Sequence, residues 1–409
     1  VTVNPTGYGR SEVMNITLPF GTAQDTNYVF VTFDQNGVMN AKVKACVVDI
    51  QELNQTNKEP QKVRKGFFKL DIPALSDVQL YVIVSSGGPL ECQSSDYSCA
   101  TKINPQVITS SSVMANQYVK VNFDQKGDLT RFENSASGLV EDIDESFKFY
   151  YTNRGSRSGL YLFNPRENQT TVSFINSEIT MFNALDMFQM LQVYQKESHT
   201  KALKTYIIYK EGSPDLMRQL FTEVQVFSND YIELSYSLKV NYKSQNSEFR
   251  AYADDSMKMV KRPVFDPKVK VKASNSVELN GYFTSPCVHG GMLRETYKDA
   301  NGGSHDNFFG WANSNPLGCT FSGNNQVDIM LFRNIGGNDN KGVNERFLDS
   351  HVSSTSFQFY AETSAKNALD MKAQANSKIN EPLFSHVKSF VFSQADQVEN
   401  PSGTAEEYC

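Results

Sequence analysis

Alternation of apolar and polar residues with a period of two dominates the chain and predicts β-strands. The pattern is clearest in four segments: Tyr28–Phe33, Val78–Val84, Tyr118–Phe123 and Tyr231–Val240. The first and third run into Asp-Gln-Asn-Gly and Asp-Gln-Lys-Gly sequences, which are typical of turns. Aromatic residues make up 12% of the chain, which suits sheets packed face to face. The sequence therefore predicts a mainly β architecture.

Two segments have helical character. Glu362–Ala375 is rich in Ala, Leu, Met and Lys and precedes Pro382, so one C-terminal helix is predicted near 362–375. Asn183–Tyr194 also has apolar residues at helical spacing, but its β-branched and aromatic neighbours leave helix and strand both open.

The serine run Ser110–Ser112 marks a plausible domain boundary. Residues 1–110 are expected to form a small β-sandwich, which is an ordinary size for an all-β unit. Residues 113–409 are expected to form a large β-supersandwich that carries the helix, and a unit of roughly 300 residues can bury a sizeable core.

Composition limits the classes of partner. The net charge of −6 and pI near 5.5 argue against nucleic acid, because phosphate binding relies on clustered Lys and Arg. No stretch of 18 or more apolar residues is present, so no membrane span is expected. The chain begins with Val1 and has no signal-like segment, which favours a processed, soluble chain. The five histidines are scattered, so no metal site is expected in this chain.

Three Asn-x-Ser/Thr sequons, at Asn15, Asn54 and Asn168, each lie beside polar, turn-like residues. One such pattern often arises by chance, but three together fit a protein of the secretory pathway, so glycosylation of these three asparagines is predicted.

The six cysteines allow disulfides in an oxidising lumen. Cys92 and Cys99 would close a short loop, and Cys287 and Cys319 flank a loop-rich stretch and form a second candidate pair. The other two cysteines are free, mutually paired or bonded to another chain, and these alternatives stay open: Cys46 and Cys409.

The segment Asn324–Glu345 is a strand that runs into a loop rich in Gly, Asn and Asp. It resembles, in register and without gaps, the pattern D-G-x-[IV]-E-[LV]-M-[LV]-x-R-R-x-x-x-D-D-x-R-G-[VL]-x-[EQ] of glycoside hydrolase family 38, the lysosomal- and Golgi-type α-mannosidases. The matching residues are Val327, Met330, Leu331, Arg333, Asp339, Gly342, Val343 and Glu345.

Four further segments resemble motifs of the same family and occur in the family's order: Val3–Val13, Phe123–Leu139, Ser158–Pro165 and Tyr252–Lys258. The resemblance implies the β-domains that follow the catalytic barrel, including a supersandwich of the galactose mutarotase-like type. In the family, the barrel holds zinc through His and Asp ligands and carries two catalytic Asp residues. This chain is therefore expected to be a middle piece of such an enzyme, cut at both ends and inactive alone.

In the family, loops of the β-domains contact the sugar at the barrel mouth. The resemblance suggests Tyr282, Asp339 and Lys341 as the nearest equivalents here. An aromatic face suits the apolar side of a sugar ring, and charged groups suit its hydroxyls. The alternative is that all three are ordinary loop residues.

Three arginines of the family pattern are replaced, by Lys258, Asn315 and Lys341, and lysine lacks the planar fork of arginine. Two functions are therefore expected as alternatives. The first is the non-catalytic β-domain chain of a processed lysosomal-type α-mannosidase that acts on α-mannosides of N-glycans, bound to a barrel chain, in the lysosome or outside the cell. The second is a catalytically inactive carbohydrate-binding or structural glycoprotein.

Overall fold

The computed structural model describes residues 2–4, 10–18, 26–33, 39–40, 43–72, 76–85, 99–152, 170–171, 174, 176–184, 186–242, 247–252, 259–262, 284–321, 325–336, 347–364 and 366–368. The chain forms two compact units. Unit 1 contains residues 1–50, 63–104 and 381–409, and unit 2 contains residues 51–62 and 105–380. The predicted boundaries of independently folding domains at 110 and 113 remain predictions.

Unit 1 contains two four-stranded sheets, ordered β1-β7-β3-β4 and β2-β6-β5-β8. Two of their strands, β5 and β6, continue into residues 51–62 of unit 2. The strands are β1 (Thr2–Asn4), β2 (Arg10–Leu18), β3 (Asn27–Phe33), β4 (Met39–Asn40), β5 (Ala45–Leu53), β6 (Pro60–Ile72), β7 (Ser76–Ser85) and β8 (Thr101–Ile103).

Alternation along these strands explains the core of unit 1. Phe30 of β3 and Phe68 of β6 are fully buried, and their rings lie 5.4 Å apart between centroids. Met14 and Leu18 of β2 pack into the same cluster, because every second side chain of a strand points to one face. Gly66 leaves room for Phe30, since a Cβ at position 66 would lie 2.4 Å from the Phe30 ring.

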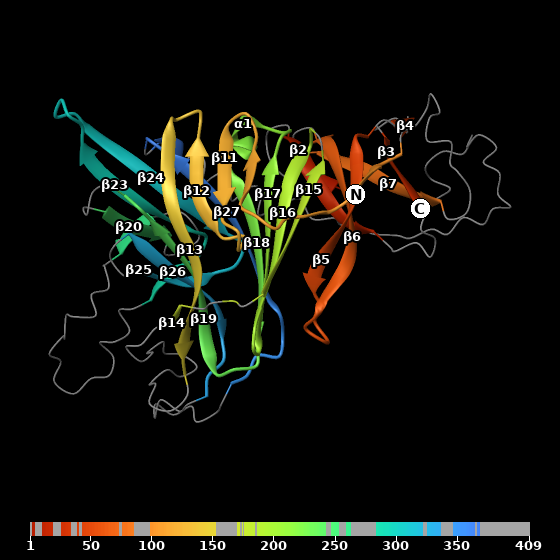
Figure 1. The fold of residues 1–409 in the computed structure, drawn as a ribbon. Coiled ribbons are helices and arrows are strands. Elements are labelled where there is room, and N and C mark those ends of the chain that lie inside the picture. Colours follow the sequence, from red (N-terminus) through yellow and green to blue (C-terminus); the bar gives the residue numbers. More distant parts are fainter. Residues whose placement is uncertain are drawn as a thin grey trace. The chain divides into compact units, whose positions relative to one another are not determined.

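Unit 2 is built from a ten-stranded and a nine-stranded sheet (Figure 1). The ten-stranded sheet has the order β21-β20-β23-β24-β27-β18-β17-β16-β15-β9. Its strands are β9 (Gln106–Val107), β15 (Asn176–Ala184), β16 (Phe188–Glu197), β17 (Thr200–Tyr209), β18 (Leu220–Ser228), β20 (Ser247–Tyr252), β21 (Met259–Arg262), β23 (Gly291–Lys298), β24 (Ser304–Asn313) and β27 (Ser353–Glu362).

The nine-stranded sheet has the order β10-β11-β12-β13-β19-β26-β25-β22, with β14 paired to β13. Its strands are β10 (Ser112–Ala115), β11 (Val119–Phe123), β12 (Leu129–Asn134), β13 (Leu139–Tyr151), β14 (Thr170–Thr171), β19 (Ile232–Val240), β22 (Ser285–Cys287), β25 (Leu317–Phe321) and β26 (Gln326–Arg333). Neighbouring strands of both sheets pair antiparallel.

The inner faces of these two sheets share one large apolar core. Tyr236 of β19 stacks on Phe357 of β27, with ring centroids 5.6 Å apart, and Phe132 of β12 meets Phe309 of β24 edge-on, with centroids 6.1 Å apart. Each of these rings is fully buried. Such rings bury a large apolar area and prefer offset contacts, so they hold the sheets face to face. The prediction of a mainly β fold with sandwiched sheets is confirmed.

Helical residues are few among those described. The short helix α1 (Pro214–Met217) begins after Ser213, whose hydroxyl accepts the N–H of Leu216. Near the predicted C-terminal helix, 366–368 are helical, but Glu362 ends β27, and 369–375 lie outside the described residues. The helix therefore starts later than predicted. Within the described part of the chain, no helix has both the length and the apolarity needed to cross a membrane.

The helical interpretation of Asn183–Tyr194 is wrong. Ala184 ends β15, Phe188 begins β16, and the two strands pair as a hairpin. The apolar residues there are buried on both faces of β16, so they do not show the simple alternation of a half-buried strand.

Candidate functional site

The candidate site is a polar cluster on the face of the nine-stranded sheet that lies opposite the main core. We call it the outer-face cluster and define it by residues on β13, β19 and β26: Lys148, Tyr150, Glu233, Ser237, Asp328 and Arg333. Alternate residues of the same strands belong to the core, so strand periodicity places the cluster on the opposite face.

Asp328 is the centre of the outer-face cluster and is only 3% exposed. Its Oδ2 accepts the Tyr150 hydroxyl at 2.8 Å, and its Oδ1 accepts the Ser237 hydroxyl at 2.6 Å. Gln326 Nε2 donates to Oδ1 at 2.8 Å, and the Lys148 ammonium lies 3.3 Å from the same oxygen. Both carboxylate oxygens therefore have partners, which suits a structural anchor for β26 better than a proton-transfer group.

A second ion pair lies at the end of β26. Arg333 Nε donates to Glu233 Oε1 at 2.7 Å, and the Arg333 guanidinium Nη2 contacts the same oxygen. Glu233 is fully buried, whereas Arg333 remains 29% exposed. The buried carboxylate thus fixes the arginine at the point where the chain leaves the strand.

Burial and a neighbouring carboxylate keep the Tyr150 phenol of the cluster protonated. Burial, followed by the charge of Asp328, raises the pKa of Tyr150 far above its usual range. The phenol therefore stays a hydrogen-bond donor.

An ionic network lies in the interior, between the two sheets of unit 2. Glu145 of β13 accepts the hydroxyls of Tyr206 and Tyr236, each at 2.6 Å. Lys204 Nζ lies 2.6 Å from Asp128 Oδ1 and 3.2 Å from Glu145 Oε1, and both Lys204 and Glu145 are fully buried.

Burial alone would lower the pKa of Lys204, but Asp128 and Glu145 raise it above its ordinary value. Lys204 therefore remains charged. We call these five residues the interior network: Asp128, Glu145, Lys204, Tyr206 and Tyr236.

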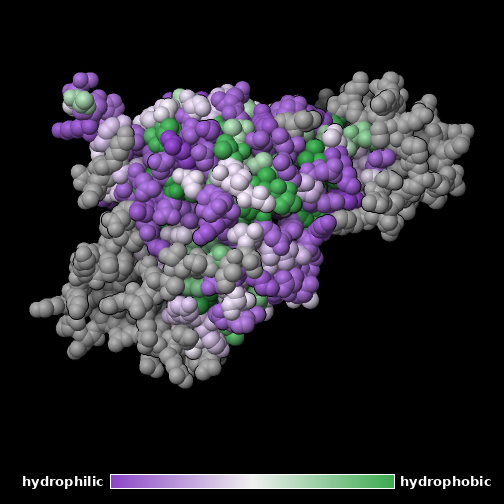
Figure 2. Space-filling model, in the orientation of Figure 1, coloured by the Kyte–Doolittle hydropathy of each residue, from purple (hydrophilic) through white to green (hydrophobic). Residues whose placement is uncertain are grey.

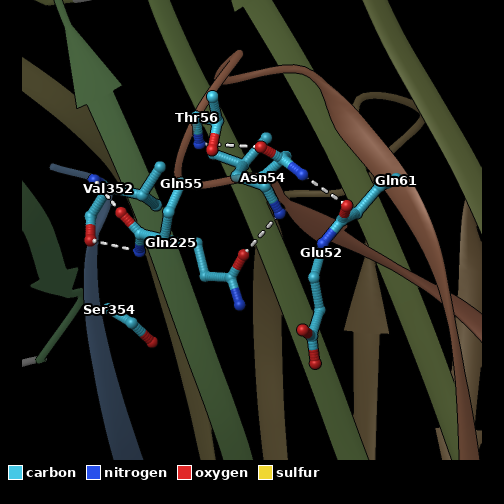
Figure 3. Close-up of a pocket in the computed structure, with 9 residues that line it drawn as sticks. Glu52, Asn54, Gln55, Thr56, Gln61, Gln225, Val352 and Ser354 are labelled. Carbon is cyan, nitrogen blue, oxygen red and sulfur yellow. Dashed lines mark hydrogen bonds between the residues drawn. The ribbon is translucent and has the colours of Figure 1, made fainter.

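A polar hollow of about 280 Å³ lies beside residues 51–62, the tip of the β5–β6 hairpin (Figure 3). We call it the hairpin-tip hollow, and its lining is Glu52, Leu53, Asn54, Gln55, Thr56, Gln61, Gln225, Val352 and Ser354. The lining combines carboxamides, a carboxylate and hydroxyls with two aliphatic side chains.

Three glutamine side chains hold the hairpin tip on the ten-stranded sheet by pairing with backbone groups. Gln192 accepts the N–H of Gln51 at 2.9 Å and donates to its carbonyl at 3.0 Å. Gln55 pairs in the same two-way manner with the backbone of Val352, at 2.9 and 3.2 Å. Gln225 Oε1 accepts the N–H of Leu53 at 2.8 Å.

An apolar cluster lies under the tip: Leu53, Tyr194, Leu203, Phe227 and Val352. An ion pair also links the tip to β17, because Lys201 Nζ lies 2.5 Å from Glu59 Oε1. These contacts hold the hairpin tip in one position on the ten-stranded sheet, so the wall of the hollow that the tip forms is also fixed.

The surface of unit 2 drawn in Figure 2 is mainly hydrophilic, and its hydrophobic side chains lie in small separate areas. Among the described residues of unit 2, the exposed large hydrophobic side chains are few: Val107, Val113, Val140, Tyr151, Phe347 and Leu348. Within the described residues, no three His, Cys, Asp or Glu side chains lie close enough together to hold a metal ion.

The predicted sugar-contact residues Tyr282, Asp339 and Lys341 lie outside the described residues, as do Cys92, Cys409 and Asn168. The structure contains the predicted disulfide between Cys287 of β22 and Cys319 of β25, with Cα atoms 5.9 Å apart. Cys99 is also disulfide-bonded.

The two described sequons differ in setting. Asn15 lies in the middle of β2, opposite Phe67 of β6. Asn54 lies at the hairpin tip and lines the hollow. Glycosylation of either residue remains a prediction.

Sequence reasoning missed the outer-face cluster, the interior network and the glutamine contacts. A signal was present only for the outer-face cluster, because polar residues alternate with apolar ones in Ser146–Phe149 and Glu233–Ser237. The pattern shows that these residues share a face but not which distant strand supplies the partner. The glutamine contacts join residues up to 297 positions apart, so no local sequence pattern could have predicted them.

Solved structures with a similar fold include an α-mannosidase from Enterococcus faecalis. That structure has a TM-score of 0.56 and 14% sequence identity over 92% of this chain and 44% of its own. A protein in the glycosyl hydrolase family 38 from the same organism has a TM-score of 0.56 and 13% identity, over 92% and 46% of the two chains. The chain thus spans less than half the length of either structure. No protein-family profile and no curated protein sequence matches the chain.

Proposed function

We propose that this chain is the β-rich, non-catalytic part of an α-mannosidase-type glycoside hydrolase that acts on α-mannosides of N-glycans. The observation that carries the proposal is the shared fold over 92% of the chain with an α-mannosidase and with a family 38 protein. Five sequence motifs in the family's order support the same assignment. We propose that the enzyme is of the lysosomal type, with a lysosomal or extracellular location, and the three sequons support this proposal.

The outer-face cluster has a defined role in this proposal. It fixes β26 through Asp328 and through the Arg333–Glu233 ion pair, immediately before the segment that carries Asp339 and Lys341. A rigid strand end positions a following loop more accurately than a mobile one. We therefore infer that β26 presents Asp339 and Lys341 to the sugar, and that Tyr282 supplies an aromatic face.

The catalytic steps belong to the barrel, carried by another chain or segment. In the proposed retaining reaction, one barrel carboxylate attacks the anomeric carbon and a second carboxyl group transfers the proton. In the proposed enzyme, zinc would be held by His and Asp residues of that barrel. The contribution of this chain is binding and orientation of the sugar.

One observation favours the alternative of an inactive carbohydrate-binding or structural glycoprotein. Asn315 occupies a position where the family pattern has arginine. Its Nδ2 donates to the backbone carbonyl of Ser354 at 2.9 Å. The side chain thus ties the turn between β24 and β25 to β27 and offers no cation to a substrate.

The experiment compares the chain alone with the chain co-expressed with a barrel, using an aryl α-mannoside as substrate. The chain alone should show no turnover, and the co-expressed pair should form a complex by native mass measurement and hydrolyse the substrate. Asp339→Asn and Lys341→Met in that complex should mainly raise KM, whereas the exposed-residue variant Lys261→Met should match the unchanged complex. A stable, monomeric chain that binds mannose-containing glycans and no barrel would favour the alternative function.

A further inference from the structure

The sequon Asn54-Gln-Thr56 borders the hairpin-tip hollow, and all three of its residues line it (Figure 3). It occupies the turn between β5 and β6. The turn is closed by the N–H of Asn54, which donates to the Glu59 carbonyl at 3.0 Å, and by the N–H of Lys58, which donates to the Asn54 carbonyl at 2.9 Å.

The Asn54 carboxamide has a fixed orientation. Its Oδ1 accepts the backbone N–H groups of Thr56 at 2.7 Å and Asn57 at 3.1 Å, which is an Asx turn. Its Nδ2, the atom to which an N-linked sugar attaches, donates one hydrogen to Gln61 Oε1. A glycosylated asparagine keeps one N–H, so this hydrogen bond and the turn can persist after modification.

The lining of the hollow fits the chemistry of N-acetylglucosamine. Glu52 and Ser354 line the hollow with oxygen atoms that can accept from sugar hydroxyls or from the acetamide N–H, and Val352 adds an apolar side chain beside which its methyl group can lie. Gln225 adds a polar wall, although its amide already pairs with the N–H of Leu53 and with Glu223. A volume of about 280 Å³ is at the scale of one sugar residue rather than of a drug-sized ligand.

We propose that Asn54 carries an N-linked glycan whose first N-acetylglucosamine lies in the hairpin-tip hollow. In the attachment step, Nδ2 bonds to the anomeric carbon of an oligosaccharide donated by a lipid pyrophosphate. The bond from that carbon to the pyrophosphate oxygen breaks, Nδ2 loses a proton, and the lipid pyrophosphate leaves. This inference goes beyond the proposed function and shares with it only passage through the secretory pathway.

The test uses the full chain secreted from a eukaryotic host, with Asn15→Gln and Asn168→Gln so that Asn54 is the only remaining sequon. Peptide mapping after amidase release should find Asn54 modified. Adding Thr56→Ser should retain the modification and adding Thr56→Ala should abolish it. An unmodified Asn54 in the Asn54-only chain overturns the proposal.

Seating in the hollow is tested by the rate of glycan release from the folded chain relative to the unfolded chain. One net hydrogen bond to the sugar should slow release from the folded chain about fivefold. Ser354→Tyr fills the hollow and should remove this protection, whereas Ser304→Tyr, at an exposed position that does not line the hollow, should leave it unchanged. Equal release rates from folded and unfolded protein, or protection that survives Ser354→Tyr, would reject the seated sugar. Both readouts are independent of mannosidase activity.

Discussion

Replacing Lys204 by Met is the sharpest test of how unit 2 is stabilised. The substitution keeps a long apolar side chain but leaves Glu145 buried without its cation, and removing one partner of a buried pair typically costs about 3–5 kcal/mol. Two tyrosine hydroxyls still donate to Glu145, and the Asp128 side chain is 23% exposed and can be hydrated. We therefore expect Lys204→Met to lower the free energy of unfolding by about 3 kcal/mol, the lower end of that range.

Guanidinium unfolding followed by tryptophan fluorescence measures this loss. Trp311 is the single tryptophan of the sequence and is fully buried in the main core of unit 2, so its signal reports on that unit. Adding Glu145→Gln to Lys204→Met should recover most of the loss, because no uncompensated charge remains at that position. The control Lys261→Met removes a 63% exposed ammonium and should cost less than about 1 kcal/mol. A loss below about 1 kcal/mol for Lys204→Met would refute the reasoning.

Three further substitutions test other features. Burial raises the pKa of Glu362 above its ordinary value of 4.5, so the ionised form is disfavoured in the folded state. Glu362→Gln should raise the melting temperature at pH 7, and the difference should vanish as the pH falls below 4.5, where glutamate is protonated in both folded and unfolded states. Cys319→Ser opens a link to Cys287 across 32 residues and should cost about 3–4 kcal/mol in chemical denaturation, while an unchanged midpoint would contradict this. Gly290→Ala should prevent folding or strongly lower the melting temperature, because its Cβ would lie 2.1 Å from a backbone oxygen. The control Gly302→Ala, with φ +84° and open space around it, should cost only about 1 kcal/mol.

The strands were the most predictable part of the fold. The structure places Tyr28–Phe33 and Tyr231–Val240 in β3 and β19 within one residue of the predicted ends. Both faces of β19 are buried, but Glu233, Ser235 and Ser237 make one of them polar, so the alternation of residue types remains visible in the sequence. Asn183–Tyr194 was left open between helix and strand because apolar side chains occupy both faces of β16, which removes the alternation of apolar and polar residues that identifies a strand.

The candidate site was less predictable than the fold. The Cys287–Cys319 disulfide followed from spacing and from the loop-rich segment between the two cysteines. Asp328 was not recognised, since its significance depends on Tyr150, which lies 178 residues earlier in the chain. Sequence pattern identifies the face on which a side chain lies, but only the order of strands in the sheet brings β13, β19 and β26 together.

The glutamine contacts of the hairpin tip also affect the timing of folding. The side chain of Gln55 cannot pair with the backbone of Val352 until the ribosome has synthesised that residue, 297 positions later. At roughly 5–20 residues per second, synthesis of the intervening chain takes on the order of 15–60 seconds. During that interval the turn at Asn54 stays accessible to enzymes that act on the growing chain. The hairpin tip should then be among the last parts of unit 2 to gain protection from hydrogen exchange during folding from the ribosome.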